Sequence, residues 1–128
     1  MISYPTIGLM SGTSMDGIDA ILVYTNGKKI TRTKFKSITP YSKETYDLLQ
    51  IAVKNPIKFI NNKDFYDRLS YLITCEHAKV VEELIFLSKV KPYLIGFHGQ
   101  TIFHDVGSKI SYQLGDGKLL SKLLELNV

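Results

Sequence analysis

The 128-residue sequence lacks several features that define whole classes of protein. Cys75 is its only cysteine, so no disulfide can form within the chain, and a reducing compartment is expected. No apolar stretch reaches the roughly 18–20 residues that span a bilayer, and the first residues lack the pattern of a signal peptide. We therefore expect a cytoplasmic chain that has no membrane partner.

The sequence also has little concentration of charge of one sign. Its 16 lysines and arginines exceed its 12 acidic residues by enough to give a net charge of +4, but they are dispersed. No run of four or more basic residues occurs, whereas nucleic-acid binding usually needs a clustered basic surface. We therefore expect no nucleic-acid partner. The 45% share of apolar residues is typical of a globular fold.

The order of predicted elements indicates an α/β fold with a mixed sheet and packed helices. Apolar and alternating patterns predict strands over residues 6–10, 18–24, 29–38, 93–97, 101–104 and 110–114. Asn26-Gly27 is a strong hairpin signal, so the first three strands should form an antiparallel meander. Helical patterns cover residues 42–53, 63–88 and 118–126. In the long helix, His77 lies on the apolar stripe, and we interpret it as a hydrogen-bonded core histidine.

The strongest motif is Gly8-Leu-Met-Ser-Gly-Thr-Ser-Met-Asp-Gly-Ile-Asp19, between the first two predicted strands. Its glycines permit tight backbone geometry, and successive N–H groups in such a loop can bind an anion. The hydroxyl groups of Thr13 and Ser14 suit phosphate oxygens, and Asp16 could hold Mg²⁺ through water. The alternative is an ordinary Ser/Gly hairpin loop. The loop is neither a P-loop nor a Rossmann turn, because it lacks both glycine patterns.

Two further segments carry polar residues beside glycines. The first is Gly96-Phe-His-Gly-Gln-Thr101, and the second is Gln113-Leu-Gly-Asp116. His98 and Gln100 follow a predicted strand and would suit the lip of a polar site. Asp116 precedes a predicted helix, so it is either a helix cap or a ligand to a sugar hydroxyl or hydrated magnesium.

These three segments, in this order and approximate spacing, resemble the N-terminal part of the anhydro-N-acetylmuramic acid kinases. The resemblance implies an actin/hexokinase-like (ribonuclease H-like) ATPase fold with two lobes around a nucleotide cleft. It also implies that Mg-ATP phosphorylates O6 of 1,6-anhydro-N-acetylmuramic acid while water opens the anhydro bridge. The product would be N-acetylmuramic acid 6-phosphate, an intermediate of cell-wall recycling.

The same resemblance assigns expected roles to residues of this chain. Asp16 would help to place Mg²⁺, and sugar contact is expected near His98, Gly99, Gln100 and Asp116. The residues that would cradle the ATP phosphates are Gly12, Thr13, Ser14, Met15, Asp16, Gly17, Ile18 and Asp19.

The sequence departs from the family pattern because family chains are far longer. They continue into an Asp-Thr-Gly-Pro-Gly-Asn-like motif, whose Asp resembles the general base, and into the adenosine-binding lobe. Residues 1–128 contain no such motif, so the resemblance implies a general base beyond Val128. We therefore expect residues 1–128 to be a partial domain, an N-terminal lobe portion that needs a complementing C-terminal chain. The alternatives are a non-catalytic remnant and an interaction module that keeps a phosphate-binding loop.

Overall fold

The structure is a computed structural model that describes residues 2–12, 15–105, 107 and 110–128. The chain opens with three strands, β1 (Tyr4–Met10), β2 (Gly17–Thr25) and β3 (Ile30–Pro40). β1 pairs antiparallel with β2, and β2 pairs antiparallel with β3. The predicted meander is therefore confirmed.

A fourth strand makes the sheet mixed. β4 (Leu94–Gly96) pairs parallel with β1, which gives the strand order β3-β2-β1-β4. β5 (Gln100–Asp105) and β6 (Ile110–Leu114) form a separate antiparallel ladder. A parallel bridge between Ser11 and Gln100 connects the end of β1 to the start of β5. The mixed α/β sheet is as predicted, but β4 is shorter than the predicted strand.

Each helix begins at a polar residue whose side chain accepts a backbone N–H. Ser42, Asn55, Asn62 and Asp116 have this capping role, which satisfies N–H groups that the first turn leaves without a partner. The helices are α1 (Lys43–Lys54), α2 (Pro56–Ile60), α3 (Lys63–Ser88) and α4 (Gly117–Leu124). The short helix α2 is not among the predicted helices, which leave a gap between residues 53 and 63. Proline also suits the first turn of a new helix, and α2 begins with it.

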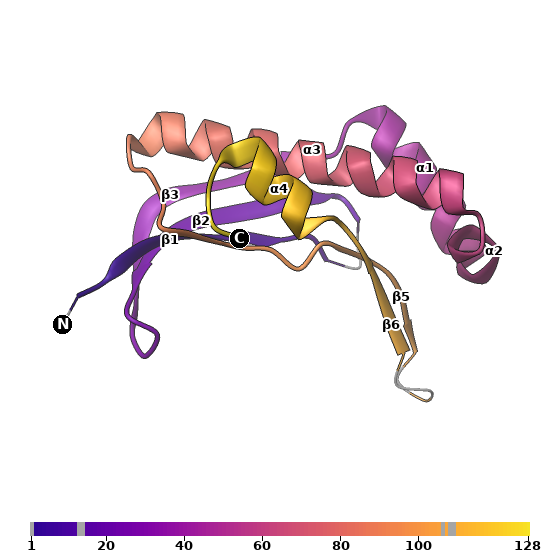
Figure 1. Cartoon of the computed structure of the whole chain (residues 1–128), viewed down its shortest axis with the longest axis horizontal. Coiled ribbons are helices and arrows are strands. Elements are labelled where there is room, and N and C mark those ends of the chain that lie inside the picture. Colours follow the sequence, from indigo (N-terminus) through magenta and orange to yellow (C-terminus); the bar gives the residue numbers. More distant parts are fainter. Residues whose placement is uncertain (1, 13–14, 106, 108–109) are drawn as a thin grey trace.

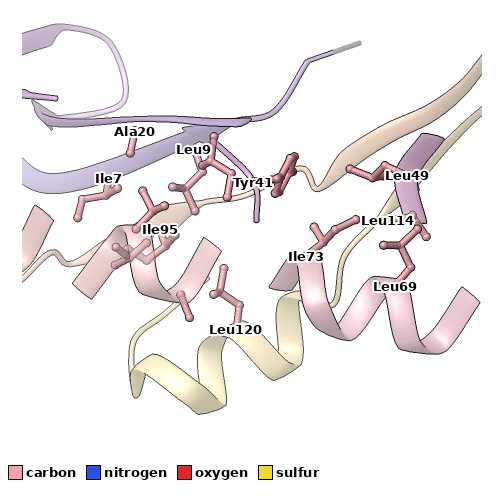
Figure 2. Close-up of a cluster of buried hydrophobic side chains, with 14 of the residues drawn as sticks. Ile7, Leu9, Ala20, Tyr41, Leu49, Leu69, Ile73, Ile95, Leu114 and Leu120 are labelled. Carbon is pink, nitrogen blue, oxygen red and sulfur yellow. The ribbon is translucent and has the colours of Figure 1, made fainter. Parts of the chain in front are cut away.

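The helices α1, α3 and α4 lie on one side of the four-stranded sheet (Figure 1). Strand residues that point to this side are buried, including Ile7, Leu9, Ile18 and Leu22. Figure 2 shows side chains from the sheet, α3 and α4 directed into one core. His77 is 1% exposed in this core, so its interpretation as a buried histidine is confirmed.

The opposite side of the sheet has no such cover from the described helices. Met10 on β1 is 62% exposed and Ile38 on β3 is 82% exposed, although both are large apolar side chains. Within the described part of the chain, no helix combines the length and the apolar character that crossing a membrane would require.

The segment after α4 returns to the sheet. The Ile95 N–H of β4 donates to the carbonyl oxygen of Asn127 over 2.9 Å. Val128 lies beside the start of α4, where its Cγ1 would be 3.8 Å from a side-chain carbon placed on Gly117. The predicted helix over residues 118–126 is therefore shorter in the structure, because the left-handed backbone of Glu125 ends α4 and turns the chain back.

Candidate functional site at the end of β1

The glycine-rich loop connects the end of β1 to the start of β2. Its described residues include a tight turn, in which the Met15 N–H donates to the carbonyl oxygen of Gly12 over 3.1 Å. Met15 has φ 57°, in the left-handed region that few side chains adopt. Two of the predicted phosphate ligands, Thr13 and Ser14, lie outside the described residues.

The two glycines of this loop have different structural surroundings. A side-chain carbon placed on Gly17 would run into the carbonyl oxygen of Thr39 on β3, so the fold itself requires glycine there. A side-chain carbon on Gly12 would meet no atom of the described residues within 4 Å, and Gly12 does not have a positive φ. Its lack of a side chain therefore leaves open space beside the backbone, where a ligand can approach closely.

Tyr41 and Gln100 hold both ends of the loop. The Gln100 side-chain amide donates to the Gly12 carbonyl oxygen over 2.7 Å, and its carbonyl oxygen accepts the Tyr41 hydroxyl over 2.9 Å. The Tyr41 backbone N–H donates to the carbonyl oxygen of Asp16 over 3.3 Å. Gln100 is fully buried and Tyr41 is 7% exposed, so water cannot easily replace these contacts.

A second set of buried contacts joins the end of β1 to α3. Ser11 Oγ lies 3.1 Å from His77 Nε2 and 3.0 Å from the Gly99 carbonyl oxygen. The other ring nitrogen, Nδ1, lies 2.8 Å from the carbonyl oxygen of Ile73, which can only accept. His77 Nδ1 therefore carries the proton, and in the neutral ring Nε2 is an acceptor. It shares the one hydroxyl hydrogen of Ser11 with the Gly99 carbonyl oxygen, to which Ser11 donates.

Burial shifts the titration of two members of this cluster. Burial lowers the pKa of His77 to about 4, against a smaller raising effect from its hydrogen bond to Ile73. Burial also raises the pKa of Tyr41 above its ordinary value. At neutral pH His77 is therefore uncharged. The Tyr41 hydroxyl keeps its proton and donates a hydrogen bond to the Gln100 side-chain oxygen.

The three residues of the Gly96–Thr101 segment for which sugar contact is expected have different environments. His98 is exposed, whereas Gly99 is buried with φ 79° and its Cα faces the backbone of Leu114. The polar atoms of Gln100 contact Tyr41, Gly12 and the carbonyl oxygen of Thr101. Sugar contact by these residues stays a prediction, and only His98 has a side chain open to solvent.

Asp116 is the N-cap of α4. Its carboxylate accepts the Leu119 N–H over 3.1 Å, and its own N–H donates to Thr74 Oγ1 on α3 over 3.0 Å. The helix-cap alternative for Asp116 is therefore confirmed. Asp116 remains exposed, so a sugar contact from its second carboxylate oxygen stays a prediction.

An apolar hollow of 740 Å³ opens on the uncovered face of the sheet, beside the loop. Gly8 and Gly96 are register partners in its floor, and the lack of two side chains deepens the hollow. Met10, Ile21 and Ile38 supply its apolar lining, while Asp19 and Lys36 bring charge to it. Asp19 pairs with Met10 at the end of β1, so its exposed carboxylate lies near the loop.

The donor set fits magnesium better than a transition metal. Among the described residues no group of three or more His, Cys, Asp or Glu side chains gathers to hold a metal. Magnesium usually binds one or two carboxylates and keeps waters and phosphate oxygens as its other ligands. Asp16, exposed at the exit of the loop, could supply such a carboxylate.

The sequence gives different signals for the residues of the buried cluster formed by Ser11, Tyr41, His77 and Gln100. Ser11 lies within the first motif but was not predicted as a partner of His77, because residues far apart in the sequence give no sign of contact. Tyr41 follows Pro40 in an ordinary strand-to-helix connection, and nothing in its local pattern indicates a buried hydroxyl.

A mixed sheet with packed helices, and with a glycine-rich loop at the end of its first strand, defines an α/β protein with a candidate ligand site at that edge. Comparison with known proteins makes the assignment more specific. The family model for anhydro-N-acetylmuramic acid kinase matches residues 4–128. The chain belongs to the anhydro-N-acetylmuramic acid kinase family, as the sequence motifs predicted.

Individual relatives agree with this assignment. The anhydro-N-acetylmuramic acid kinase of Pelagibacter ubique is 43% identical over 98% of this chain and 34% of the relative's length. That of Rhodospirillum rubrum is 38% identical over 95% of this chain and 32% of the relative. That of Zymomonas mobilis is 32% identical over 95% of this chain and 36% of the relative. The chain thus spans about a third of the length of these curated relatives.

Proposed function

We propose that this chain is the N-terminal portion of an ATP-dependent kinase that converts 1,6-anhydro-N-acetylmuramic acid to N-acetylmuramic acid 6-phosphate. The reaction would transfer a phosphoryl group to O6 while water opens the anhydro bridge, as one step of cell-wall recycling in the cytoplasm. The observation that carries this proposal is the family match over residues 4–128. The open space beside Gly12 supports it, because a phosphate-binding loop must let its ligand approach the backbone.

In this proposal residues 12–19 cradle the ATP phosphates. Phosphoryl transfer depends mainly on positioning and on stabilising charge, which backbone N–H groups can supply. Asp16 would hold Mg²⁺ through water, and the bound ion would neutralise charge on the phosphates. His98 is the member of the predicted sugar-contact set whose exposure best suits that role, with Asp116 as a second exposed candidate.

We further propose that residues 1–128 form part of the N-terminal lobe of an actin/hexokinase-like ATPase domain. The antiparallel meander with a fourth strand parallel to β1 supports this fold. The general base and the adenosine pocket would then correspond to the part of the family's length that follows the position of Val128. A complementing C-terminal polypeptide would supply them.

The uncovered sheet face supports the need for further polypeptide. Parallel strand pairs usually lie in sheets that are covered on both faces, and β1 pairs parallel with β4. The exposed Met10 and Ile38 would leave water if another segment packed there. The same face also favours the second candidate function, an interaction module that keeps the phosphate-binding loop.

The first test separates ligand binding from folding. The chain would be joined to the remaining two thirds of the Pelagibacter ubique relative, and Mg-ATP affinity measured by calorimetry for Gly12→Val and Asp16→Ala. We expect both variants to lose at least about tenfold in affinity, while Gly12→Val keeps its unfolding midpoint because the fold leaves space for a side chain there. Asp47→Ala on α1 is the matched control and should bind normally.

Unchanged ATP affinity in both variants would contradict the assignment of the loop as the phosphate site. The interaction-module alternative is tested by sedimentation of the chain alone. A monodisperse monomer at high concentration would exclude self-association through the uncovered face.

A further inference from the structure

We propose that Tyr41 and Gln100 form a bracket that fixes Gly12 and Asp16, at the two ends of the glycine-rich loop, and that both are positioning residues for the phosphate site. The inference rests on the proposed function of this loop. The two residues do not touch the ligand in this proposal. They act by holding the loop backbone, which contacts the ligand in this proposal.

The bracket closes on itself through three hydrogen bonds. Gln100 holds the entrance of the loop at the Gly12 carbonyl oxygen, and the Tyr41 backbone N–H holds the exit at the Asp16 carbonyl oxygen. The Tyr41 hydroxyl then donates to Gln100 and joins the two holding points to each other. Because both ends are tied to one pair of residues, Gly12 and Asp16 cannot move apart without breaking at least one of these bonds.

The bonding capacity of the two side chains is used within the protein. The Gln100 amide nitrogen donates to Gly12 and to the Thr101 carbonyl oxygen, and its oxygen accepts from Tyr41. Among the described residues, no buried side-chain nitrogen or oxygen lacks a partner. A buried amide is costly to leave unsatisfied, so each member of the bracket depends on the others.

The bracket also sets the loop in register with the His98 segment. Gln100 forms a backbone bridge with Ser11, and the carbonyl oxygen of Gly99 lies within hydrogen-bond distance of the Ser11 hydroxyl. Ser11 in turn contacts His77 of α3. The loop and the exposed His98 are therefore fixed to the same buried cluster, and the relative position of the phosphate and sugar contacts would follow from it.

The decisive variant is Tyr41→Phe, which removes one hydroxyl and keeps the ring. The chain is studied by amide hydrogen exchange, read by NMR at the N–H groups of Met15 and of Tyr41 itself, which donate to Gly12 and Asp16. We expect exchange at these amides to accelerate at least about fivefold, as the loss of one hydrogen bond implies. Amides in the centre of α3 should keep their rates.

Two further variants complete the test. Tyr46→Phe on α1 is the matched control, because this tyrosine is 42% exposed, and it should leave loop exchange unchanged. Gln100→Glu keeps the shape of the side chain but removes the donor to Gly12, so it should accelerate exchange at Met15 as Tyr41→Phe does. Unchanged exchange at Met15 in both bracket variants would overturn the proposal, as would an equal rise throughout α3.

A titration with Mg-ATP on the same samples, and on the joined protein used above, separates this inference from the proposed function. If wild-type protein binds and Tyr41→Phe binds at least about fivefold more weakly, the positioning role is supported. Equal affinities would overturn it. If the wild-type joined protein shows no binding, the proposed function fails, while the exchange rates still decide whether the bracket holds the loop.

Discussion

The side-chain amide of Gln100 donates to the carbonyl oxygen of Gly12 over 2.7 Å, although 88 positions in the sequence separate the two residues. This bond joins two of the three motifs that carry the family resemblance. Through it, the segment after β4 supports the loop after β1. The buried cluster of Ser11, Tyr41, His77 and Gln100, which contains this bond, therefore connects segments that are far apart in the sequence.

The first prediction concerns pH. Burial lowers the pKa of His77 to about 4 in the folded chain, compared with about 6.5 when unfolded. The unfolded chain therefore takes up this proton first, and the contribution of His77 to stability is complete above pH 6.5 and falls as the pH drops toward 4. We expect a loss of about 2 kcal/mol between pH 7 and pH 5 from this group alone.

Urea unfolding at several pH values measures this loss. His77→Gln is the comparison, because other titrating groups contribute equally to both proteins. The difference in unfolding free energy between wild type and variant should shrink as the pH falls. A difference that stays constant from pH 7 to pH 5 would contradict the burial of a neutral His77.

The second prediction compares two glycines that both have positive φ. Gly27 has φ 91° with no atom near a side-chain carbon, whereas one on Gly99 would collide with the carbonyl oxygen of Leu114. Gly27→Ala should cost about 1 kcal/mol, from backbone strain alone. Gly99→Ala should cost clearly more, because it adds a steric collision. Thermal unfolding of the two variants gives the comparison, and equal losses would show that the β6 backbone does not approach Gly99 so closely.

The third prediction tests which face of α3 is in the core. Leu84 is 1% exposed and Leu87, three residues later, is 63% exposed. Leu84→Ala should lower the free energy of unfolding by about 2–5 kcal/mol, because it leaves a cavity. Leu87→Ala should change it by less than about 0.5 kcal/mol. Chemical unfolding of both variants measures these changes. Similar losses of unfolding free energy would contradict the assignment of Leu84, and not Leu87, to the buried face of α3.

The fourth prediction separates the two roles of Asp116. Because Asp116 is the N-cap of α4, Asp116→Ala should lower the free energy of unfolding by about 1 kcal/mol. Asp116→Asn should change it little, because Asn also caps well. If Asp116 also contacts sugar through its charge, Asp116→Asn would weaken sugar binding in the complemented enzyme at unchanged stability. Calorimetry with the sugar and thermal unfolding are measured on the same two variants. Equal stability of all three proteins would exclude the capping role.

Much of the fold follows from local patterns in the sequence. The Asn26-Gly27 turn joins two alternating strands, and the polar caps Ser42 and Asn62 precede apolar periodicity, so these elements were predictable. The helix α2 was missed because Pro56 ends one helix and begins the next, and sequence pattern gives the two events the same signal. The uncovered sheet face was also not predicted, because single strands do not reveal which elements cover them.

The site was predictable only in its motifs. Glycine, serine and aspartate in a loop after a strand predict a candidate ligand site, with an ordinary hairpin loop as the alternative. The roles of Tyr41 and Ser11 depend on contacts between distant segments, which no local pattern encodes. Gln100 shows the difference most clearly. Its motif predicts Gln100 as a sugar-contact residue, whereas in the structure Gln100 is buried and its side-chain amide bonds to other protein atoms.

The general base stays a prediction. The family pattern implies an Asp beyond Val128, since residues 1–128 contain no Asp-Thr-Gly-Pro-Gly-Asn-like motif. Asp16 lies in the loop and Asp19 lies in β2 just after it, and both are exposed. Either of them is therefore the alternative that an activity measurement has to exclude.

The most direct test of the central claim is turnover. The purified chain is mixed with Mg-ATP and 1,6-anhydro-N-acetylmuramic acid, alone and with a polypeptide supplying the remaining two thirds of a relative, and the 6-phosphate product is measured by mass spectrometry. We predict no product from the chain alone and product from the mixture. Product formed in proportion to the chain alone would contradict the claim that its general base lies elsewhere, and a carboxylate such as Asp16, Asp19 or Asp116 would have to serve. No product from the mixture, under conditions in which an intact relative turns over, would contradict the kinase function itself.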